Sequence, residues 1–358
     1  MAELRPVAPA RSAPAFIVTV DTEGDNLWGR PRTVTTYNAR FVQRFQGLCE
    51  SFGLRPTWLT NHEMARCQTF LAFGRDVVRR STGEIGMHLH AWNSPPLVPL
   101  TSDDMRAQPF LTEYPAEVVE AKVAHMARLL RERFECEIVS HRGGRWALDA
   151  ISAQALVRHG IRVDCSVTPG VRWQRQRLHG EDSTGAAVVD YRGFPMRPYL
   201  LDLAEPSRAD RSGRSPLLEV PMTVLPSGLY RTLPQAYRVP LLRRWSWAWQ
   251  PTHHWMYPDG RNLEAMLRVV RRAVDQRWPH LEMVLHSSEL MPGGSPTFGD
   301  AAVIEKLYRD LEVLFRSVSA HFRGLTLAEF AAQWQARTST HPVANADPQT
   351  AVATGGRW

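Results

Sequence analysis

The sequence has few cysteines, and none of them is spaced for redox or metal chemistry. Its 358 residues contain four, Cys49, Cys67, Cys136 and Cys165, which are scattered along the chain. The absence of any C-x-x-C pair argues against a zinc ribbon and against a thioredoxin-type site. In a chain of this length we expect reduced thiols in a cytosolic protein, most of them small core residues.

Long hydrophobic runs are also lacking. No stretch approaches the roughly 18 consecutive apolar residues of a membrane span. The first twenty residues contain Pro6, Pro9 and Pro14, and they lack the apolar stretch of about 7–15 residues found in secretory signal peptides. We therefore expect a cytoplasmic protein.

The charge balance is basic, with 43 Lys and Arg against 36 Asp and Glu, a net charge of +7. Such a balance is one mark of a nucleic-acid-binding protein. No recognised binding motif is present, however, and the arginines are dispersed: Arg131, Arg133, Arg172, Arg175, Arg177, Arg243 and Arg244. We therefore do not expect a nucleic-acid partner, and we interpret the charge as a surface property that would favour acidic glycans.

Short apolar runs alternate with amphipathic segments, which predicts a parallel α/β architecture. The predicted strands are 16–20, 56–60, 84–90, 137–140, 161–164, 217–220 and 281–286. Helices are predicted at 41–52, from Pro115 to about 130, at 148–159 and 263–274, and from about Asp300 onward. Seven strands suit either a barrel-like closure or an open sheet, and periodicity alone does not choose between them.

The domain organisation is predicted to be simple. We expect one domain over 14–335, with long irregular insertions near 166–215 and 226–262. Residues 1–13 and 336–358 are predicted to be disordered tails, because the second is rich in Thr, Ala, Pro and Gly and has no apolar period.

Five of the seven predicted strands end in titratable or chelating side chains. Active sites of parallel α/β barrels lie at the carboxyl ends of the strands. The residues are Asp21 with Glu23, His88 with His90, Arg142, Asp164 and His286. Side chains two apart on a strand share a face, so each of the two pairs projects together. Two carboxylates and two imidazoles would form a metal site with a base beside it and one position open for water.

Each of these residues also has a purely structural interpretation. Taken singly, they read as follows: Asp21 and Glu23 as loop caps, a lone His88 or His90 as a hydrogen-bonded core histidine, Arg142 with Asp164 as an ion pair, and His286 as a hydroxyl partner of Ser287 or Ser288. Their joint appearance at strand ends favours a functional site.

Five segments, in this order, resemble the motifs of the polysaccharide deacetylases, the NodB-like carbohydrate esterases. The segments are 19–24 (TVDTEG), 83–92 (GEIGMHLHAW), 141–146 (HRGGRW), 163–169 (VDCSVTP) and 285–290 (LHSSEL). The second is similar to the variant that reads HLHxW before a Pro-Pro pair, here Pro95-Pro96, and residues 53–59 resemble the second strand of the family. The resemblance spans residues 16 to about 325.

The resemblance implies a distorted (β/α) barrel of about seven strands and a metal-assisted hydrolase. Such an enzyme would remove an N-acetyl or related acyl group from an amino sugar in a glycan or a glycan precursor. It would use a divalent metal, first of all Zn, with Co, Ni or Mn as alternatives. The matched positions imply these roles: Asp21 as general base, Glu23 and His88 as metal ligands, Arg142 holding the base, His286 as general acid and Asp164 supporting it.

Two positions depart from the common pattern of the family. Its histidines lie four apart, but the fourth residue after His88 is Trp92, so a second histidine ligand would be His90. Glu23 also replaces an Asp and adds one methylene of reach. A metal-independent amidase of the same fold, or a catalytically inactive carbohydrate-binding barrel, therefore stays open as an alternative. The sequence does not indicate an oligomeric state.

The twelve tryptophans are concentrated after strand ends and before the helix at 263–274. Aromatic faces suit the apolar C–H surfaces of sugar rings, although a Trp-rich loop packed on the barrel as core is an equal alternative. We expect four of them to bind substrate: Trp28, Trp92, Trp146 and Trp255.

Overall fold

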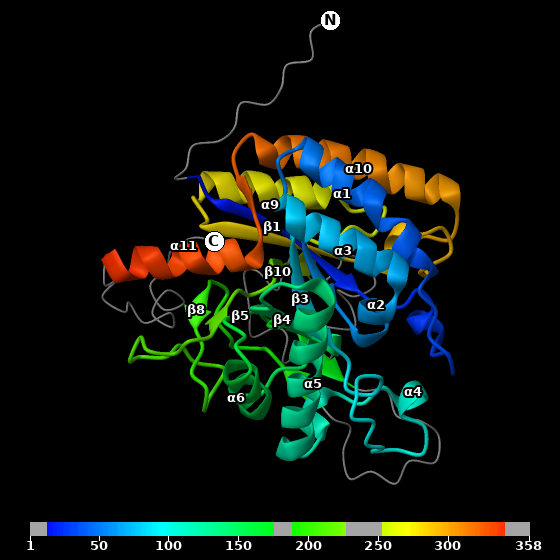
Figure 1. Ribbon diagram of the computed structural model, residues 1–358. Helices are drawn as coiled ribbons and strands as arrows, with labels where there is room; N and C mark the ends of the chain where they lie inside the picture. The colour runs from blue at the N-terminus through cyan, green and yellow to red at the C-terminus, as the bar shows by residue number, and fades with distance from the viewer. Residues whose placement is uncertain (1–12, 175–187, 227–252, 341–358) are drawn as a thin grey trace, which may run out of the picture.

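The structure is a computed structural model that describes residues 13–174, 188–226 and 253–340 (Figure 1). A curled, mostly parallel sheet forms its centre, in the order β12-β1-β2-β3-β4-β5-β9-β8. The parallel strands are β1 (Ala15–Thr22), β2 (Thr57–Thr60), β3 (Glu84–Leu89), β4 (Ser140–Gly143), β5 (Val163–Asp164), β9 (Leu218–Glu219) and β12 (His280–His286). They correspond to the seven predicted strands, and the predicted distorted (β/α) barrel is confirmed.

The strand β1 is the centre of the sheet. It pairs with β12 along most of its length, and its other edge pairs first with β13 (Arg323–Leu325) and then with β2. At the far edge of the sheet, β8 (Tyr199–Leu200) runs antiparallel to β9. In the described sheet, β12 and β9 are not neighbours, so strand pairing leaves the barrel open on one side.

The chain that follows β9 bridges this open side. Thr223 Oγ1 accepts a hydrogen bond from the backbone N–H of Glu282, and its carbonyl accepts one from Met256. Met256 in turn accepts the N–H of Val284. Two short strands lie here, β10 (Val224–Pro226) and β11 (His253–Trp255), and they pair antiparallel. Two further strands, β6 (Arg172–Gln174) and β7 (Val188–Asp190), form a separate ribbon.

Helices surround the sheet, most of them on its outer face (Figure 1). They are α1 (Val42–Ser51), α2 (His62–Arg66), α3 (Gln68–Arg80), α4 (Asp104–Ala107), α5 (Ala116–Phe134), α6 (Ala150–Arg158), α9 (Leu263–Asp275), α10 (Ala301–Ser319) and α11 (Leu327–Thr340). The five predicted helices match α1, α5, α6, α9 and α10. Helix α11 continues to Thr340, beyond the domain end predicted at 335. Residues 341–358 of the predicted C-terminal tail and residues 1–12 of the predicted N-terminal tail lie outside the described residues.

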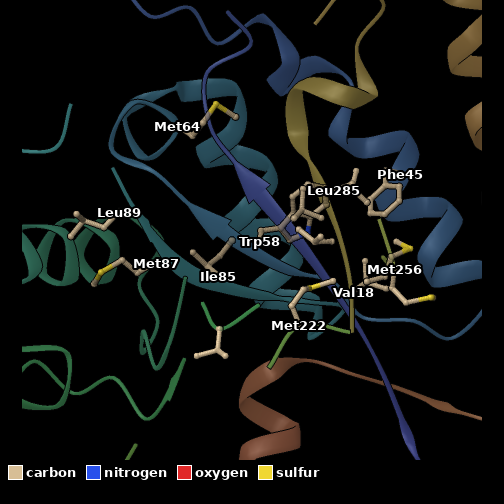
Figure 2. Close-up of a cluster of buried hydrophobic side chains, with 14 of the residues drawn as sticks. Val18, Phe45, Trp58, Met64, Ile85, Met87, Leu89, Met222, Met256 and Leu285 are labelled. Atoms are coloured by element: carbon tan, nitrogen blue, oxygen red, sulfur yellow. The ribbon is translucent and has the colours of Figure 1, made fainter. Parts of the chain in front are cut away.

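The outward-facing side chains of the strands pack against these helices. Trp58 on β2 is fully buried, and its ring contacts that of Phe45 (Figure 2). The ring also contacts Phe70 and Phe73, and its indole N–H donates to Gln46. Burying a tryptophan removes roughly 200 Å² of surface from water, which makes this position a major contributor to the core.

The inner face of β1 changes from apolar to polar along the strand. Ala15 and Ile17 belong to a buried cluster that also contains Leu59, Val163, Leu218 and residues of α11. The next inward positions are Thr19 and Asp21, because alternate residues of a strand share a face. The amino end of the barrel is thus filled by hydrophobic side chains and α11, and the carboxyl end holds polar groups.

One strand lies later in the sequence than predicted. The pattern at 137–140 predicts a strand there, but β4 begins at Ser140 and ends at Gly143. Arg142 therefore lies within the strand, in register with His88 of β3. This register puts the Arg142 side chain inside the barrel, on the same face as His88.

Candidate metal and catalytic site

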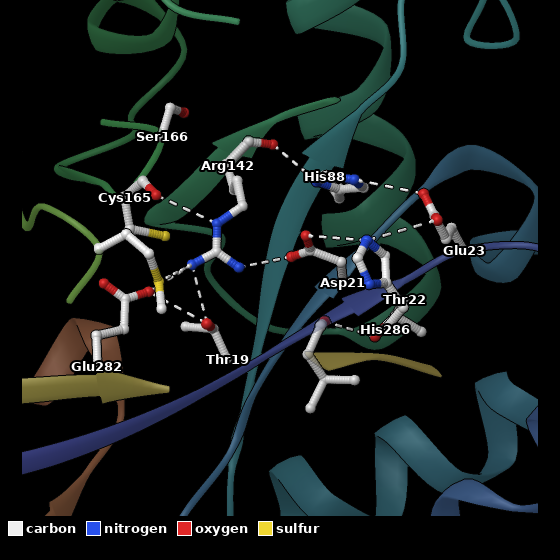
Figure 3. Close-up of polar contacts among 12 residues, drawn as sticks. Thr19, Asp21, Thr22, Glu23, His88, Arg142, Cys165, Ser166, Glu282 and His286 are labelled. Atoms are coloured by element: carbon white, nitrogen blue, oxygen red, sulfur yellow. Dashed lines mark hydrogen bonds and ion pairs between the residues drawn. The ribbon is translucent and has the colours of Figure 1, made fainter. Parts of the chain in front are cut away.

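Polar side chains from several strands meet at the carboxyl end of the barrel (Figure 3), and some of them line one cavity. The cavity has a volume of about 1220 Å³, and its lining includes Asp21, Glu23, His88, His90 and His286. These residues come from β1, β3 and β12 and from the loops that follow β1 and β3. The structure thus brings together all the predicted strand-end residues of these three strands.

Glu23, His88 and His90 form a cluster that is suited to a metal ion. Their potential ligand atoms all lie within 4.8 Å of one another, and all three residues are buried. The Nε2 atom of His90 lies 2.8 Å from Glu23 Oε2 and 3.0 Å from His88 Nε2. His90 therefore turns inward and lies beside Glu23 and His88.

The protonation pattern of His88 fits a ligand. Its Nδ1 lies 3.0 Å from the backbone carbonyl of Arg142, and a carbonyl only accepts hydrogen bonds. Nδ1 is therefore the hydrogen-bond donor in this contact, and Nε2 faces Glu23 and His90. Two imidazole nitrogens and a carboxylate oxygen form the mixed donor set that zinc and similar divalent cations take. The residues present fit such a cation.

Asp21 is held as a carboxylate by Arg142. Arg142 is fully buried, and its Nη1 donates to Asp21 Oδ1 at 2.6 Å. Burial by itself would raise the pKa of Asp21, but the Arg142 guanidinium, together with His88 and His286, holds it below the usual range. The second oxygen, Oδ2, lies 3.9 Å from His286 Nε2.

Glu282 on β12 shares this arginine, a contact that the sequence analysis missed. Arg142 Nη2 donates to Glu282 and also to Thr19 Oγ1 (Figure 3). Burial raises the pKa of Glu282 to about 7, against the opposing charge of Arg142. Its spacing was a usable signal, because Glu282 lies four residues before His286 and strand alternation puts both on the inner face.

His286 lies at the edge of the site beside a different carboxylate from the one expected. Its Nδ1 is 3.4 Å from Glu289 Oε2, and the same oxygen accepts the backbone N–H of His286 at 2.8 Å. Burial lowers the pKa of His286, but Glu289 more than offsets this and raises it to about 9. Glu289 also accepts a hydrogen bond from the Tyr257 hydroxyl.

Asp164 does not stand beside His286. Its Oδ2 pairs with His141 Nδ1 at 2.6 Å, and its neighbour across the sheet is Glu219 of β9. In register, Asp164 is the partner of His141, which alternates with the inward Arg142. The sheet therefore separates Asp164 from the cavity, so the expectation that Asp164 supports His286 is wrong, and the carboxylate beside His286 is Glu289.

The serines after His286 hold other parts of the site. Ser287 Oγ donates to the backbone carbonyl of Glu23, and Ser288 Oγ accepts the indole N–H of Trp28. The purely structural interpretation of His286 as a serine partner is not what the geometry shows.

Glu63 on α2 joins the two loops that carry the candidate ligands. One carboxylate oxygen accepts the backbone N–H of Gly24, and the other accepts the side-chain amide of Asn93. Gly24 follows Glu23 directly, and Asn93 lies three residues after His90. Burial raises the pKa of Glu63 to about 6. Nothing in the local sequence pattern marks this residue as a link between the two loops, since Gly24 and Asn93 are both distant from it along the chain.

Comparison with solved structures identifies the fold. The chain resembles a candidate polysaccharide deacetylase from Mycobacterium smegmatis, with a TM-score of 0.52, 14% identity and coverage of 94% of this chain and 96% of the other. It also resembles a candidate glycoside hydrolase/deacetylase from Parabacteroides distasonis, with a TM-score of 0.56, 12% identity and coverage of 92% and 73%. The chain has the polysaccharide-deacetylase fold. No family model and no curated protein matches the sequence.

The four predicted substrate-binding tryptophans all line the cavity of this deacetylase fold. Trp28 is 45% exposed, and its ring lies 5.0 Å from that of His286. Trp92 is buried and packs against His90. Trp146 lies over the Arg142 guanidinium and, together with Trp173, contacts Trp255. Aromatic side chains thus lie on two sides of the polar site, with Trp28 beside His286 and with Trp146, Trp173 and Trp255 on the side of Arg142.

The described part of the chain contains no helix that is long and apolar enough to cross a membrane.

Proposed function

We propose that the protein is a metal-assisted hydrolase that removes an N-acetyl or related acyl group from an amino sugar in a glycan or a glycan precursor. One observation carries this proposal. A buried carboxylate, a Glu–His–His cluster and a histidine held by a second carboxylate line the same cavity, and His286 Nε2 lies within 4.0 Å of both Asp21 and Glu23. Amide hydrolysis needs these groups, a base, an electrophile and an acid.

Asp21 takes the proton from the attacking water in this mechanism. Arg142 keeps it ionised and fixes Oδ1, which leaves Oδ2 for the water. A divalent cation held by Glu23, His88 and His90, when bound, supplies Lewis-acid polarisation of the scissile carbonyl. Zinc suits this donor set best.

His286 supplies a proton to the leaving amine. Its pKa of about 9 keeps it protonated at neutral pH, and Glu289 fixes the ring so that Nε2 points to the cavity side where Asp21 lies. The base is therefore deprotonated and the acid protonated under the same conditions, which is the state that amide cleavage requires.

Sugar rings would stack on the exposed aromatic faces that flank these groups. Trp28 stands beside His286, and Trp146 and Trp255 lie on the Arg142 side of the cavity. Trp92 is 4% exposed, so its main contribution is to hold the His90 ring. We further propose the cytoplasm as the compartment, with a glycan intermediate as substrate, because the four cysteines are free thiols.

The test starts from protein purified without added metal. Bound metal is measured, and acetate release is assayed on N-acetylated oligosaccharides. Asp21→Asn should lower turnover by about 10²–10⁴-fold while metal stays bound. Glu23→Gln and His88→Ala should both lower metal content. Activity that survives chelation would point to the metal-independent amidase, and sugar binding without hydrolysis of any amide would point to the inactive binder.

A further inference from the structure

The cavity carries more positive charge than the catalytic groups require. Apart from the histidines, four charged side chains of its lining are arginines: Arg30, Arg145, Arg261 and Arg268. The only acidic lining residue outside the Asp21–Glu23 centre, among those described, is Asp259. The negative charge of Asp21 is already balanced by Arg142. The part of the cavity lining outside Asp21 and Glu23 therefore carries four arginines against one aspartate, which is a positive excess.

Two of these arginines belong to one face of α9 and the turn before it. The cavity lining includes Arg261, Asn262, Ala265 and Arg268. Asn262, Ala265 and Arg268 are three residues apart in turn, so they lie on one face of the helix. The small Ala265 side chain lies between Asn262 and Arg268 on this face, which leaves room for a ligand to approach both.

Neither guanidinium is neutralised within the described residues. Arg261 and Arg268 are both exposed, and no ion pair of the described chain includes either of them. The carboxylate of Asp259 accepts the backbone N–H of Arg261 at 2.8 Å. The charge of Arg268 does reach the cavity wall, since burial and this arginine together lower the pKa of His254.

These arginines are tied to the reacting end of the cavity. The Tyr257 ring lies 5.9 Å from the ring of His286. Asn262 Nδ2 donates to the Tyr257 carbonyl at 2.7 Å, and Asn262 Oδ1 accepts the N–H of Asp259 at 3.1 Å, so 257–262 is folded into a turn. Arg261 is four residues from Tyr257, so the Cα atoms of the two residues are at most about 14 Å apart. This range corresponds to a neighbouring sugar unit of a bound glycan.

We propose that the substrate is an anionic glycan, in which a carboxylate or phosphate on a sugar unit near the N-acyl amino sugar is bound by Arg261 and Arg268. This inference rests on the proposed deacylase function and deepens it. Guanidinium groups pair with carboxylates and phosphates through two parallel hydrogen bonds, which gives both affinity and orientation. The aromatic surfaces of the cavity would bind the neutral rings, and Arg261 and Arg268 would select the charged unit.

The test compares three ligands of equal length. They are a trisaccharide of N-acetylglucosamine, the same trisaccharide with a phosphate monoester on one terminal unit, and a trisaccharide whose terminal unit is a uronic acid. Their Kd values are measured by calorimetry on the Asp21→Asn variant, which prevents turnover. We expect at least one of the charged ligands to bind about tenfold or more tightly than the neutral one at low salt. Phosphate-only or carboxylate-only preference each supports the proposal and identifies the anion.

The arginine variants decide the site. Arg261→Gln and Arg268→Gln should bring the ratio of neutral to charged Kd toward one. Arg316→Gln, which removes the same charge from an exposed position of α10 outside the cavity lining, should keep the ratio. Equal Kd values for all three ligands, or a preference that survives both Arg261→Gln and Arg268→Gln, would overturn the inference.

Acetate release from the same ligands by the unmodified protein separates the two proposals. Hydrolysis without any charge preference would support the deacylase function and contradict the proposal of an anionic substrate. Charge preference in binding without hydrolysis would support anion recognition and contradict the deacylase function.

Discussion

His286 and Glu289 form a carboxylate–histidine pair at the mouth of the barrel, with Nδ1 of the ring 3.4 Å from Oε2 of the carboxylate. The same oxygen accepts the backbone N–H of His286, so the carboxylate fixes both the main chain and the ring. A histidine held in this way presents Nε2 to the cavity and stays protonated at neutral pH.

Replacing Glu289 should therefore impair proton donation without abolishing substrate binding. For Glu289→Gln we expect kcat to fall about 10–100-fold with KM little changed, because the acid is less well held and more weakly protonated. Steady-state kinetics on an N-acetylated oligosaccharide measures both constants. Glu289→Asp, which keeps the charge, should restore part of kcat. An equal loss in both variants, or a loss confined to KM, would contradict this positioning role.

The inward turn of His90 gives a second prediction. His90→Ala should reduce bound metal about as strongly as His88→Ala, because each removes one of the three proposed ligands. Metal content by elemental analysis, and affinity from competition with a chelator, provide the measurement. His321→Ala, at an exposed position after α10, serves as the control. Full metal occupancy in His90→Ala would show that this ring is not a ligand.

The buried pairing of Arg142 with two carboxylates predicts a stability effect. Arg142→Met leaves Asp21 and Glu282 buried without their counter-ion, and we expect the free energy of unfolding to fall by about 3–5 kcal/mol. Urea denaturation measures the change. Combining it with Glu282→Leu should recover part of the loss, since one unpaired carboxylate is then removed. Strict additivity of the two substitutions would show that the residues do not interact.

His280 should make the protein sensitive to mild acid. This side chain is buried against Phe330 of α11, and burial lowers its pKa to about 4. Between pH 6.5 and 4 the unfolded chain binds a proton that the folded protein excludes, so stability falls as the pH falls through this window. We expect a loss of about 2 kcal/mol between pH 7 and pH 5 from this residue.

Urea denaturation at the two pH values tests this expectation. His280→Leu should flatten the dependence, whereas the exposed His321→Leu should keep it. A pH dependence that is unchanged in His280→Leu would assign the acid sensitivity to other groups.

Much of the fold could be read from the sequence, because strands buried on both faces appear as continuous apolar runs. The run at 16–20 became β1, and the run at 281–286 became most of β12. Helix α11 was missed although Leu327, Phe330, Ala331 and Trp334 follow helical spacing. Strands such as β8, two residues long, have no pattern to recognise.

Part of the candidate site could also be predicted from the sequence. Strand alternation alone linked Asp21 with Glu23 and His88 with His90, and the structure brings all four to one cavity. The role that the family resemblance implied for Asp164, as a support of His286, is wrong, because a difference of one residue in a strand moves a side chain to the opposite face. In the structure, His141 and Asp164 are partners across the sheet on the face away from Arg142.

The sequence by itself therefore determined which chemical groups stand at the strand ends and that the architecture is parallel α/β. Periodicity and residue type carry that information locally. Only the tertiary structure decided the partners: Glu282 for Arg142, Glu289 for His286, Glu63 for the ligand loops, and α9 for the cavity wall. Charge, burial and hydrogen bonding act over a few ångströms through space, and residues that are far apart in the chain become neighbours only once the barrel has formed.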